Sequence, residues 1–163
     1  MVENVFQQLC DKFKAGGARF RVMEHEAGSK SSKSVAEIRG TELGQGAKAL
    51  CLVVKGNGVK QHVLAVLPAD MQADLSKIAA AVGGRRGSLA SPEEVMEYTG
   101  SVFGAVPPVS LHPDLKIIAA PELFTRYDEL VFNAGRLDAS IFINTEDYRR
   151  IVDPEVVDFV RAA

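Results

Sequence analysis

Lys48 occupies a position where a charged side chain is least expected. It lies near the start of an apolar run, GAKALCLVV, which extends from Gly46 to Val54. If this run is a strand, alternation makes both of its faces apolar, so the strand is central and Lys48 shares a face with leucine and valine side chains. Burying an unpaired ammonium costs several kcal/mol or lowers its pKa. Lys48 therefore either extends from the strand end to water or lines a pocket for an anionic ligand, and the pattern alone favours the first arrangement.

Three glycines precede this lysine, namely Gly40, Gly44 and Gly46, but their spacing is not that of a phosphate-binding loop. An alanine separates the last glycine from Lys48, and Ala49 stands where Ser or Thr would bind magnesium. The run also leads into a strand, whereas a phosphate-binding loop leads into a helix. We therefore reject a nucleotide-binding loop here.

A second unusual segment is FGAVPP, which spans Phe103 to Pro108 and places one glycine and two prolines inside an apolar stretch. Glycine lets a ligand approach the main chain closely, and proline makes the backbone rigid. Such a loop could present fixed amide groups to a substrate carbonyl or to a water molecule. The alternative is a strained structural connection, which the segment considered alone favours.

The histidines and cysteines show no spacing typical of a metal site or of Cys-His catalysis. They are His25, His62, His112, Cys10 and Cys51. His112 lies four residues after the second proline of the loop and could border the same site. Asp138, in a turn between two expected strands, is the carboxylate most worth testing.

The composition is that of an ordinary globular protein. The chain has 163 residues, of which 47% are hydrophobic and 25% charged, and its net charge is −2. This length predicts one domain over residues 1–163. The charge argues against extended, sequence-blind nucleic-acid binding but allows a grip on the end of an RNA. Two unpaired cysteines, no signal-peptide pattern and no membrane-spanning run favour a cytoplasmic protein, with no membrane or DNA partner.

Periodicity and turn signals predict alternating helices and strands, which favours a mixed α+β fold with a largely antiparallel central sheet surrounded by helices. Helices are expected within residues 3–14, 34–39, 73–84, 91–100, 121–128, 145–152 and 153–162. Strands are expected within residues 18–26, 47–55, 60–67, 115–120, 129–133 and 140–144, and a polar loop is expected over residues 27–33.

The clearest local signal is the pair Asn57-Gly58 between two apolar runs, which is typical of a tight β-hairpin. A two-residue turn there places Val53 opposite His62 and Lys48 opposite Leu67. It also places Lys55 opposite Lys60, an unfavourable pair of like charges.

Together, three motifs resemble the YbaK/ProX family, the free-standing relatives of the editing domain of bacterial prolyl-tRNA synthetases. They are Lys48 in GAKALCLVV, the G-x-x-x-P loop Gly104–Pro108, and VFNAGRLDASIFINTEDYRRI. The resemblance covers nearly the whole chain and is greatest to the single-domain YeaK type. It implies the YbaK editing-domain fold and an enzyme that hydrolyses the ester of mischarged aminoacyl-tRNA, releasing the amino acid and intact tRNA. It also implies that no metal ion and no cofactor are needed.

The resemblance also assigns roles to residues. Lys48 corresponds to the lysine needed for activity, which contacts the phosphate or other polar groups of the terminal adenosine. The loop residues Gly104, Ala105, Val106, Pro107 and Pro108 correspond to the backbone that holds the aminoacyl group and the attacking water. The residues expected against the pocket on the neighbouring strand and turn are Asn133, Ala134 and Gly135.

The doubled proline and the following VSL depart from the pattern of many relatives and leave the amino-acid preference open. A small side chain is expected, with serine, threonine or alanine ahead of cysteine. The expected partners are the acceptor end of aminoacyl-tRNA and a synthetase. The alternatives are a non-catalytic module that holds a tRNA end or docks on a synthetase, and hydrolysis of another small ester.

Overall fold

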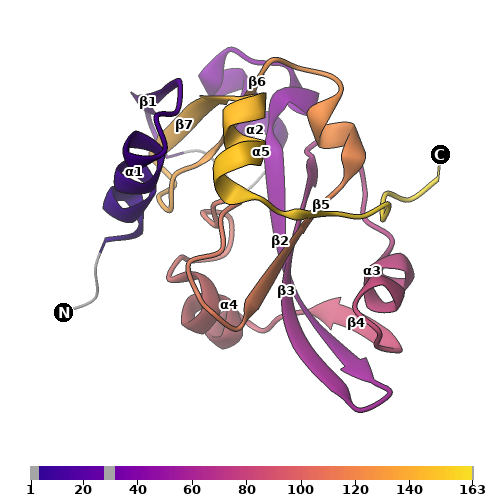
Figure 1. The fold of residues 1–163 in the computed structure, drawn as a ribbon. Coiled ribbons are helices and arrows are strands. Elements are labelled where there is room, and N and C mark those ends of the chain that lie inside the picture. Colours follow the sequence, from indigo (N-terminus) through magenta and orange to yellow (C-terminus); the bar gives the residue numbers. More distant parts are fainter. Residues whose placement is uncertain (1–3, 28–31, 163) are drawn as a thin grey trace.

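Two β-sheets form the centre of the protein in the computed structural model, which describes residues 4–27 and 32–162 (Figure 1). One sheet has the strand order β1-β7-β6, and the other has the order β4-β2-β3-β5-β8. The first sheet comprises β1 (Phe20–Glu24), β6 (Glu129–Asn133) and β7 (Ala139–Asn144). The second comprises β2 (Ala47–Gly56), β3 (Val59–Pro68), β4 (Arg86–Leu89), β5 (Leu115–Ala119) and β8 (Glu155–Val156).

All strand pairs are antiparallel except β3 with β5 and β5 with β8. The predicted α+β class with mostly antiparallel pairing is therefore confirmed, with the strands divided between two sheets instead of one. The helices are α1 (Val5–Ala15), α2 (Ser32–Arg39), α3 (Leu75–Ala81), α4 (Pro92–Thr99) and α5 (Thr145–Val152). Two 3-10 helices cover Leu43–Gln45 and Pro121–Phe124. Among the described residues, no helix is long and apolar enough to cross a bilayer.

The hairpin of β2 and β3 has the predicted register. Val53 pairs with His62, Lys48 pairs with Leu67, and Lys55 pairs with Lys60. Asn57 and Gly58 both have positive φ, as a turn of this kind requires. The N-terminus of α4 is also confirmed, because the Ser91 side chain and Glu94 form the predicted capping box.

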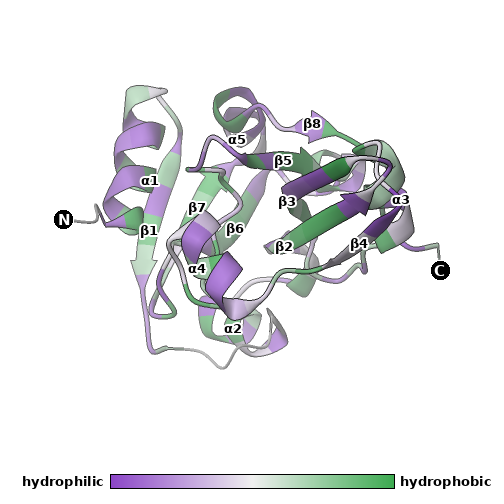
Figure 2. Cartoon of the chain, turned by 90° about the horizontal axis from the view of Figure 1, so that it is seen from below, coloured by the Kyte–Doolittle hydropathy of each residue, from purple (hydrophilic) through white to green (hydrophobic). Residues whose placement is uncertain are grey.

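The five-stranded sheet has a different cover on each face. One face of β2 and β3 contributes Leu52, Val54 and Leu67 to an apolar cluster that α3 and Phe159 close. The other face packs against the three-stranded sheet, α1 and α5, and further along against α4. Hydropathy colouring shows green stretches on the central strands β2 and β7 and purple stretches on the helices α1 and α4 (Figure 2). This second face is the one on which the candidate site lies.

The helix predicted over residues 153–162 is wrong. The chain instead forms β8 and continues in extended conformation. Asp153 ends α5 with a left-handed φ of 50°, and Pro154 follows. The open edge of β5 then supplies backbone partners, since the Val157 N–H donates to the Ala119 carbonyl at 2.9 Å, and burial of Phe159 holds the segment in place.

Strand β4 was not predicted, because its sequence RGSL shows no apolar alternation. The segment forms a strand because it pairs with the edge of β2. Helix α2 begins at Ser32, two residues before the predicted start. Most of the loop predicted over residues 27–33 lies outside the described residues.

Tyr148 joins the core to the glycine- and proline-rich loop. Its side chain is fully buried, and its hydroxyl donates to the Pro108 carbonyl at 2.6 Å. We expect Tyr148→Phe to lower the free energy of unfolding by about 1–3 kcal/mol, because a buried carbonyl loses its donor. Urea unfolding measures this. The control Tyr127→Phe, at a half-buried ring, should change stability by less than about 0.5 kcal/mol. Equal losses of stability in both variants would contradict a stabilising role for the hydrogen bond from Tyr148 to the Pro108 carbonyl.

Candidate active site

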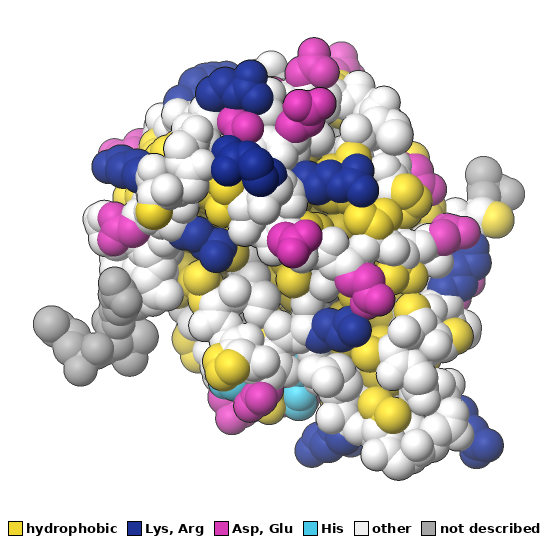
Figure 3. Space-filling model, in the orientation of Figure 1, with side chains coloured by type: hydrophobic (Ala, Val, Ile, Leu, Met, Phe, Trp, Pro, Cys, Tyr) yellow, Lys and Arg dark blue, Asp and Glu magenta, His cyan; other side chains and the backbone are white. Residues whose placement is uncertain are grey.

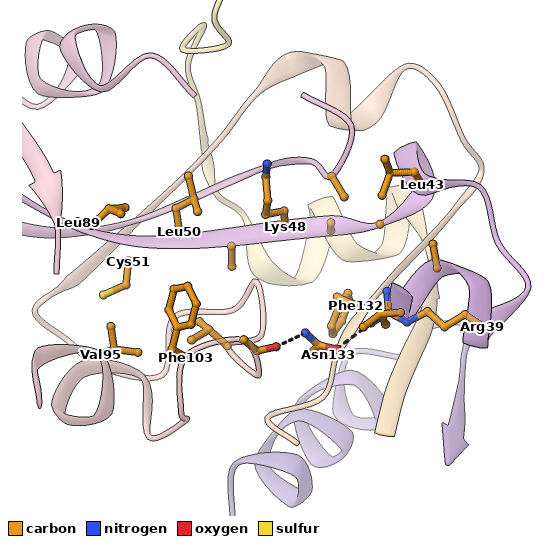
Figure 4. Close-up of a pocket in the computed structure, with 18 of the residues that line it drawn as sticks. Arg39, Leu43, Lys48, Leu50, Cys51, Leu89, Val95, Phe103, Phe132 and Asn133 are labelled. Atoms are coloured by element: carbon orange, nitrogen blue, oxygen red, sulfur yellow. Dashed lines mark hydrogen bonds between the residues drawn. The ribbon is translucent and has the colours of Figure 1, made fainter. Parts of the chain in front are cut away.

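A cavity of about 350 Å³ opens beside the first half of β2 (Figure 4). Strand β4 pairs only with residues 52–55 of β2, and β6 meets the start of β2 only through the bridge between Gly46 and Val131, so among the described residues no strand pairs with residues 47–51 on that edge. The cavity occupies this place. Its walls come from α2, the start of β2, the end of β4, α4, the 103–106 loop and the end of β6. The wall includes Arg39, Lys48, Cys51, Phe103, Gly104 and Asn133.

The loop at residues 103–108 has a fixed backbone. Gly104 has a φ of +92°, a conformation that side chains disfavour, and Pro107 and Pro108 are buried. The Ala105 N–H donates to the Val102 carbonyl at 3.0 Å. The N–H groups of Gly104 and Val106 donate to no other described residue, and both residues line the cavity. Within the described part of the chain, neither amide therefore has an acceptor.

Asn133 connects this loop to Arg39. The Asn133 Nδ2 donates to the Gly104 carbonyl, and the Arg39 Nη2 donates to the Asn133 Oδ1 at 3.0 Å (Figure 4). A guanidinium only donates hydrogen bonds, so it fixes which end of the amide faces the loop. Arg39 and Asn133, which are 94 positions apart in sequence, thus together orient the Gly104 carbonyl in the cavity wall.

Arg39 is itself anchored at strand β7. Its Nε donates to the Ser140 Oγ at 2.8 Å, and Ser140 also lies 2.8 Å from the His25 Nε2. Ser140 is fully buried and pairs across the sheet with Asn133. Burial lowers the pKa of Arg39 to about 10, which still leaves the guanidinium charged at neutral pH. Arg39 and Ser140 could not be recognised as site residues from the sequence, since neither stands in a known motif.

Lys48 borders the cavity, but its ammonium does not point at the loop. Figure 4 shows the side chain on the side of β2 opposite Phe103 and Asn133. Its Nζ donates to the Met71 carbonyl at 2.7 Å. Burial lowers the pKa of Lys48, while the Asp70 carboxylate raises it. The ammonium therefore lies at the cavity edge, close to a carboxylate, rather than beside the Gly104 carbonyl.

The other predicted residues take different places. Ala105, Pro107, Pro108 and Ala134 are buried behind the cavity wall, and Val106 lines it. Gly135 turns away toward α1, where an added Cβ would meet Val5 at 2.7 Å.

Neither of the two side chains named as possible members lines the cavity. His112 packs against Tyr98, with ring centroids 4.8 Å apart, and accepts a hydrogen bond from the Asp114 N–H. Asp138 forms an ion pair with Arg136 at 2.9 Å in the turn between β6 and β7.

Cys51 lines the cavity, but its thiol is expected to be unreactive. Burial raises the pKa of its thiol to about 11, and the charge of Glu94 adds to the effect. We expect Cys51 to resist iodoacetamide at pH 7.5 in the native protein and to react after unfolding in urea, because the thiolate is the nucleophile. Mass spectrometry of the modified chain measures this. Native alkylation of Cys51 at the rate of a free cysteine would contradict the prediction.

Comparison with known proteins places this geometry in a class. The aminoacyl-tRNA editing domain family matches residues 25–151. The chain therefore belongs to that family, as the three sequence motifs predicted. It is 60% identical over 157 residues to the Escherichia coli K12 multifunctional Ser/Thr-tRNA deacylase ProXp-y, covering 96% of this chain and 93% of that protein.

More distant relatives agree with the family and the fold. The chain is 28% identical to the proline–tRNA ligase of Stenotrophomonas maltophilia K279a, covering 79% of this chain but 22% of the ligase. A solved structure described as a candidate trans-editing enzyme for prolyl tRNA synthetase superimposes with a TM-score of 0.80 and 25% identity. That superposition covers 99% of this chain and 100% of the other.

Proposed function

We propose that the protein is a trans-acting deacylase, which hydrolyses the ester bond of mischarged aminoacyl-tRNA and releases free amino acid and intact tRNA. One observation carries the proposal. In a member of the editing-domain family, a single cavity brings together the Gly104 loop, Asn133 and the stem of Lys48. We further infer that residues 1–163 form one editing domain and that it acts in the cytoplasm.

The chemistry requires little more than positioning. An aminoacyl ester is already activated, so a placed water and a polarised carbonyl suffice for hydrolysis. In the proposed mechanism, the free N–H groups of Gly104 and Val106 stabilise the negative charge that develops on the ester carbonyl oxygen. Asn133 holds the Gly104 carbonyl so that the loop keeps the geometry in which those amides face the substrate. The ribose hydroxyl next to the ester assists the proton transfer.

Lys48 is proposed to bind the terminal nucleotide and not the reacting ester carbon. Its ammonium lies at the cavity edge, and its four-carbon stem has freely rotating bonds. The proposed partner is the phosphate or another polar group of the terminal adenosine, which replaces the Met71 carbonyl as acceptor when tRNA binds.

The substrate side chain is proposed to be small, with serine and threonine first and alanine next. The cavity of about 350 Å³ has to hold the terminal nucleoside together with the amino acid, which favours a small side chain. The name of the Escherichia coli relative, a Ser/Thr-tRNA deacylase, supports this order. An apolar pocket separates near-isosteres by modest factors, so we expect a graded preference instead of strict exclusion.

The proposed partners are the acceptor end of aminoacyl-tRNA and, for delivery of mischarged tRNA, an aminoacyl-tRNA synthetase. The relation to a domain within proline–tRNA ligases supports the second partner.

A panel of tRNAs charged with serine, threonine, alanine, cysteine and phenylalanine tests the selectivity. We expect seryl- and threonyl-tRNA to be deacylated fastest, with phenylalanyl-tRNA near the buffer rate. Equal rates for serine and phenylalanine would contradict the size argument.

A further inference from the structure

Three cations lie in a row across the strands β4, β2 and β3. Lys55 is directly opposite Lys60 on one side and directly opposite Arg86 on the other. Directly opposed residues of antiparallel strands share a face and have Cβ atoms about 5 Å apart. Arg85 adjoins the row, with its N–H donating to the Lys55 carbonyl at 2.9 Å. We call Arg86, Lys55 and Lys60 the basic row.

The charges of the basic row are exposed and uncompensated. All three side chains and Arg85 are exposed. Within residues 4–27 and 32–162, none of the four has a carboxylate within 4 Å. Glu94, on the helix that packs on this face, is held by His62 at 2.6 Å and by the Ser91 N–H. Like charges directly opposite each other destabilise a sheet, so stability does not explain this row.

An overall basic composition does not explain the row either, because the net charge of the chain is −2. These four cations lie together near the tip of the β2–β3 hairpin, while other lysine and arginine side chains lie elsewhere on the surface, several of them beside acidic ones (Figure 3). Figure 3 shows dark blue side chains at the lower end, where Figure 1 places the tip of the β2–β3 hairpin. A local cluster of lysine and arginine on one face is the electrostatic footprint of a phosphate-bearing partner.

The basic row lies on the cavity side of the sheet. Lys55 has the same strand parity as Ala49 and Cys51, which line the cavity. Arg86 lies three positions along β4 from Leu89 at the cavity rim, about 10 Å at strand spacing, and the two side chains point to opposite faces of the strand. A nucleic-acid strand that ends in the cavity and leaves it along β4 passes near the row.

We propose that the basic row, with Arg85 beside it, binds the backbone phosphates of the acceptor strand that precede the aminoacylated nucleotide. This inference rests on the proposed function, because it takes the terminal nucleotide to lie in the cavity. The row is expected to increase affinity for any tRNA end without discriminating between nucleotide sequences, because phosphate contacts carry no sequence information.

The test compares a paired variant, Lys55→Gln with Lys60→Gln, against Lys12→Gln with Lys14→Gln. The control removes the same charge from exposed positions on α1. Anisotropy of labelled, uncharged tRNA gives Kd over a series of salt concentrations. We expect about 10-fold weaker binding at low salt for the row variant and no change for the control. The slope of log K against log salt should become shallower by about 1.4, because two single-strand phosphate contacts are lost.

Hydrolysis separates this proposal from the proposed function. With seryl-tRNA the row variant should show a raised KM, and with seryl-adenosine, which lacks the preceding phosphates, it should match wild type. An unchanged salt slope, or equal losses on both substrates, would overturn the proposal. The proposal would also be overturned if the row variant bound tRNA as wild type does but no longer bound a synthetase. The row would then be a protein-docking surface. If wild type hydrolyses neither substrate, the proposed function fails, and the anisotropy result still decides the role of the row.

Thermal unfolding provides an independent measure. Lys55→Gln removes repulsion from two neighbours, so its Tm should rise by about 1–3 °C. A lower Tm would show that the row contributes to stability, which would contradict the premise of the proposal.

Discussion

Replacement of Asn133 by alanine is expected to lower kcat/KM for aminoacyl-tRNA hydrolysis by about 100-fold. Asn133 is the bridge between the Arg39 guanidinium and the Gly104 carbonyl. Without it the loop loses the contact that fixes its backbone, and a misplacement of about 1 Å at a reacting centre is enough for a loss of that size. Most of the loss should appear in kcat, since the amides of Gly104 and Val106 are proposed to act on the transition state. Single-turnover hydrolysis of seryl-tRNA measures it.

The matched variant Asn133→Asp separates the two hydrogen bonds. An aspartate still accepts from Arg39, and it gains a charge-assisted contact. It cannot donate to the Gly104 carbonyl and instead faces it with a second acceptor. We therefore expect Asn133→Asp to fold as stably as wild type and to be as slow as Asn133→Ala. If Asn133→Asp hydrolyses substrate at the wild-type rate, the link from Asn133 to the loop has no role in catalysis.

The second large effect is expected at Lys48, where Lys48→Met should lower kcat/KM by about 10- to 100-fold. That range corresponds to one lost charged hydrogen bond, worth about 1.5–3 kcal/mol. Methionine keeps the apolar stem and removes the ammonium. The loss should appear mainly as a raised KM, because the proposed partner belongs to the terminal nucleotide and not to the reacting ester.

Stability should respond to Lys48→Met much less than activity. Burial lowers the pKa of Lys48, which means that the folded protein disfavours the charged form. Removing that charge relieves this cost, while the Met71 carbonyl loses its donor, so the two effects oppose each other and the free energy of unfolding should change little. The variant Lys48→Arg keeps a cation at the cavity edge and should retain part of the affinity. A folded Lys48→Met variant with wild-type kinetics would remove Lys48 from the proposed site.

Most of the fold could be predicted because its signals are local. The Asn57-Gly58 turn sets the register of the long hairpin, and Ser91 with Glu94 marks the start of α4. The segments that were missed depend on partners distant in sequence. β4 exists as a strand because the edge of β2 is available, and residues 155–156 pair with β5 instead of forming a helix.

The site residues also fall into those that a local sequence signal predicted and those that only the fold brings together. Gly104 and Lys48 stood out because each breaks an apolar pattern, and both line the cavity. Arg39 and Ser140 could not be found by spacing, since only folding brings a helix end, a strand and a loop to one asparagine. The direction of the Lys48 ammonium also escaped prediction, because side-chain alternation gave its face but not which face carries the cavity.

The most direct test of the central claim is single-turnover release of serine from seryl-tRNA by the wild-type protein in excess. The account predicts free serine and recoverable tRNA that can be charged again, at a rate at least about 100-fold above buffer and lowered in Asn133→Ala. Tight binding of seryl-tRNA with release no faster than in buffer would contradict it, and the cavity would then belong to a module that holds the tRNA end without cleaving the ester.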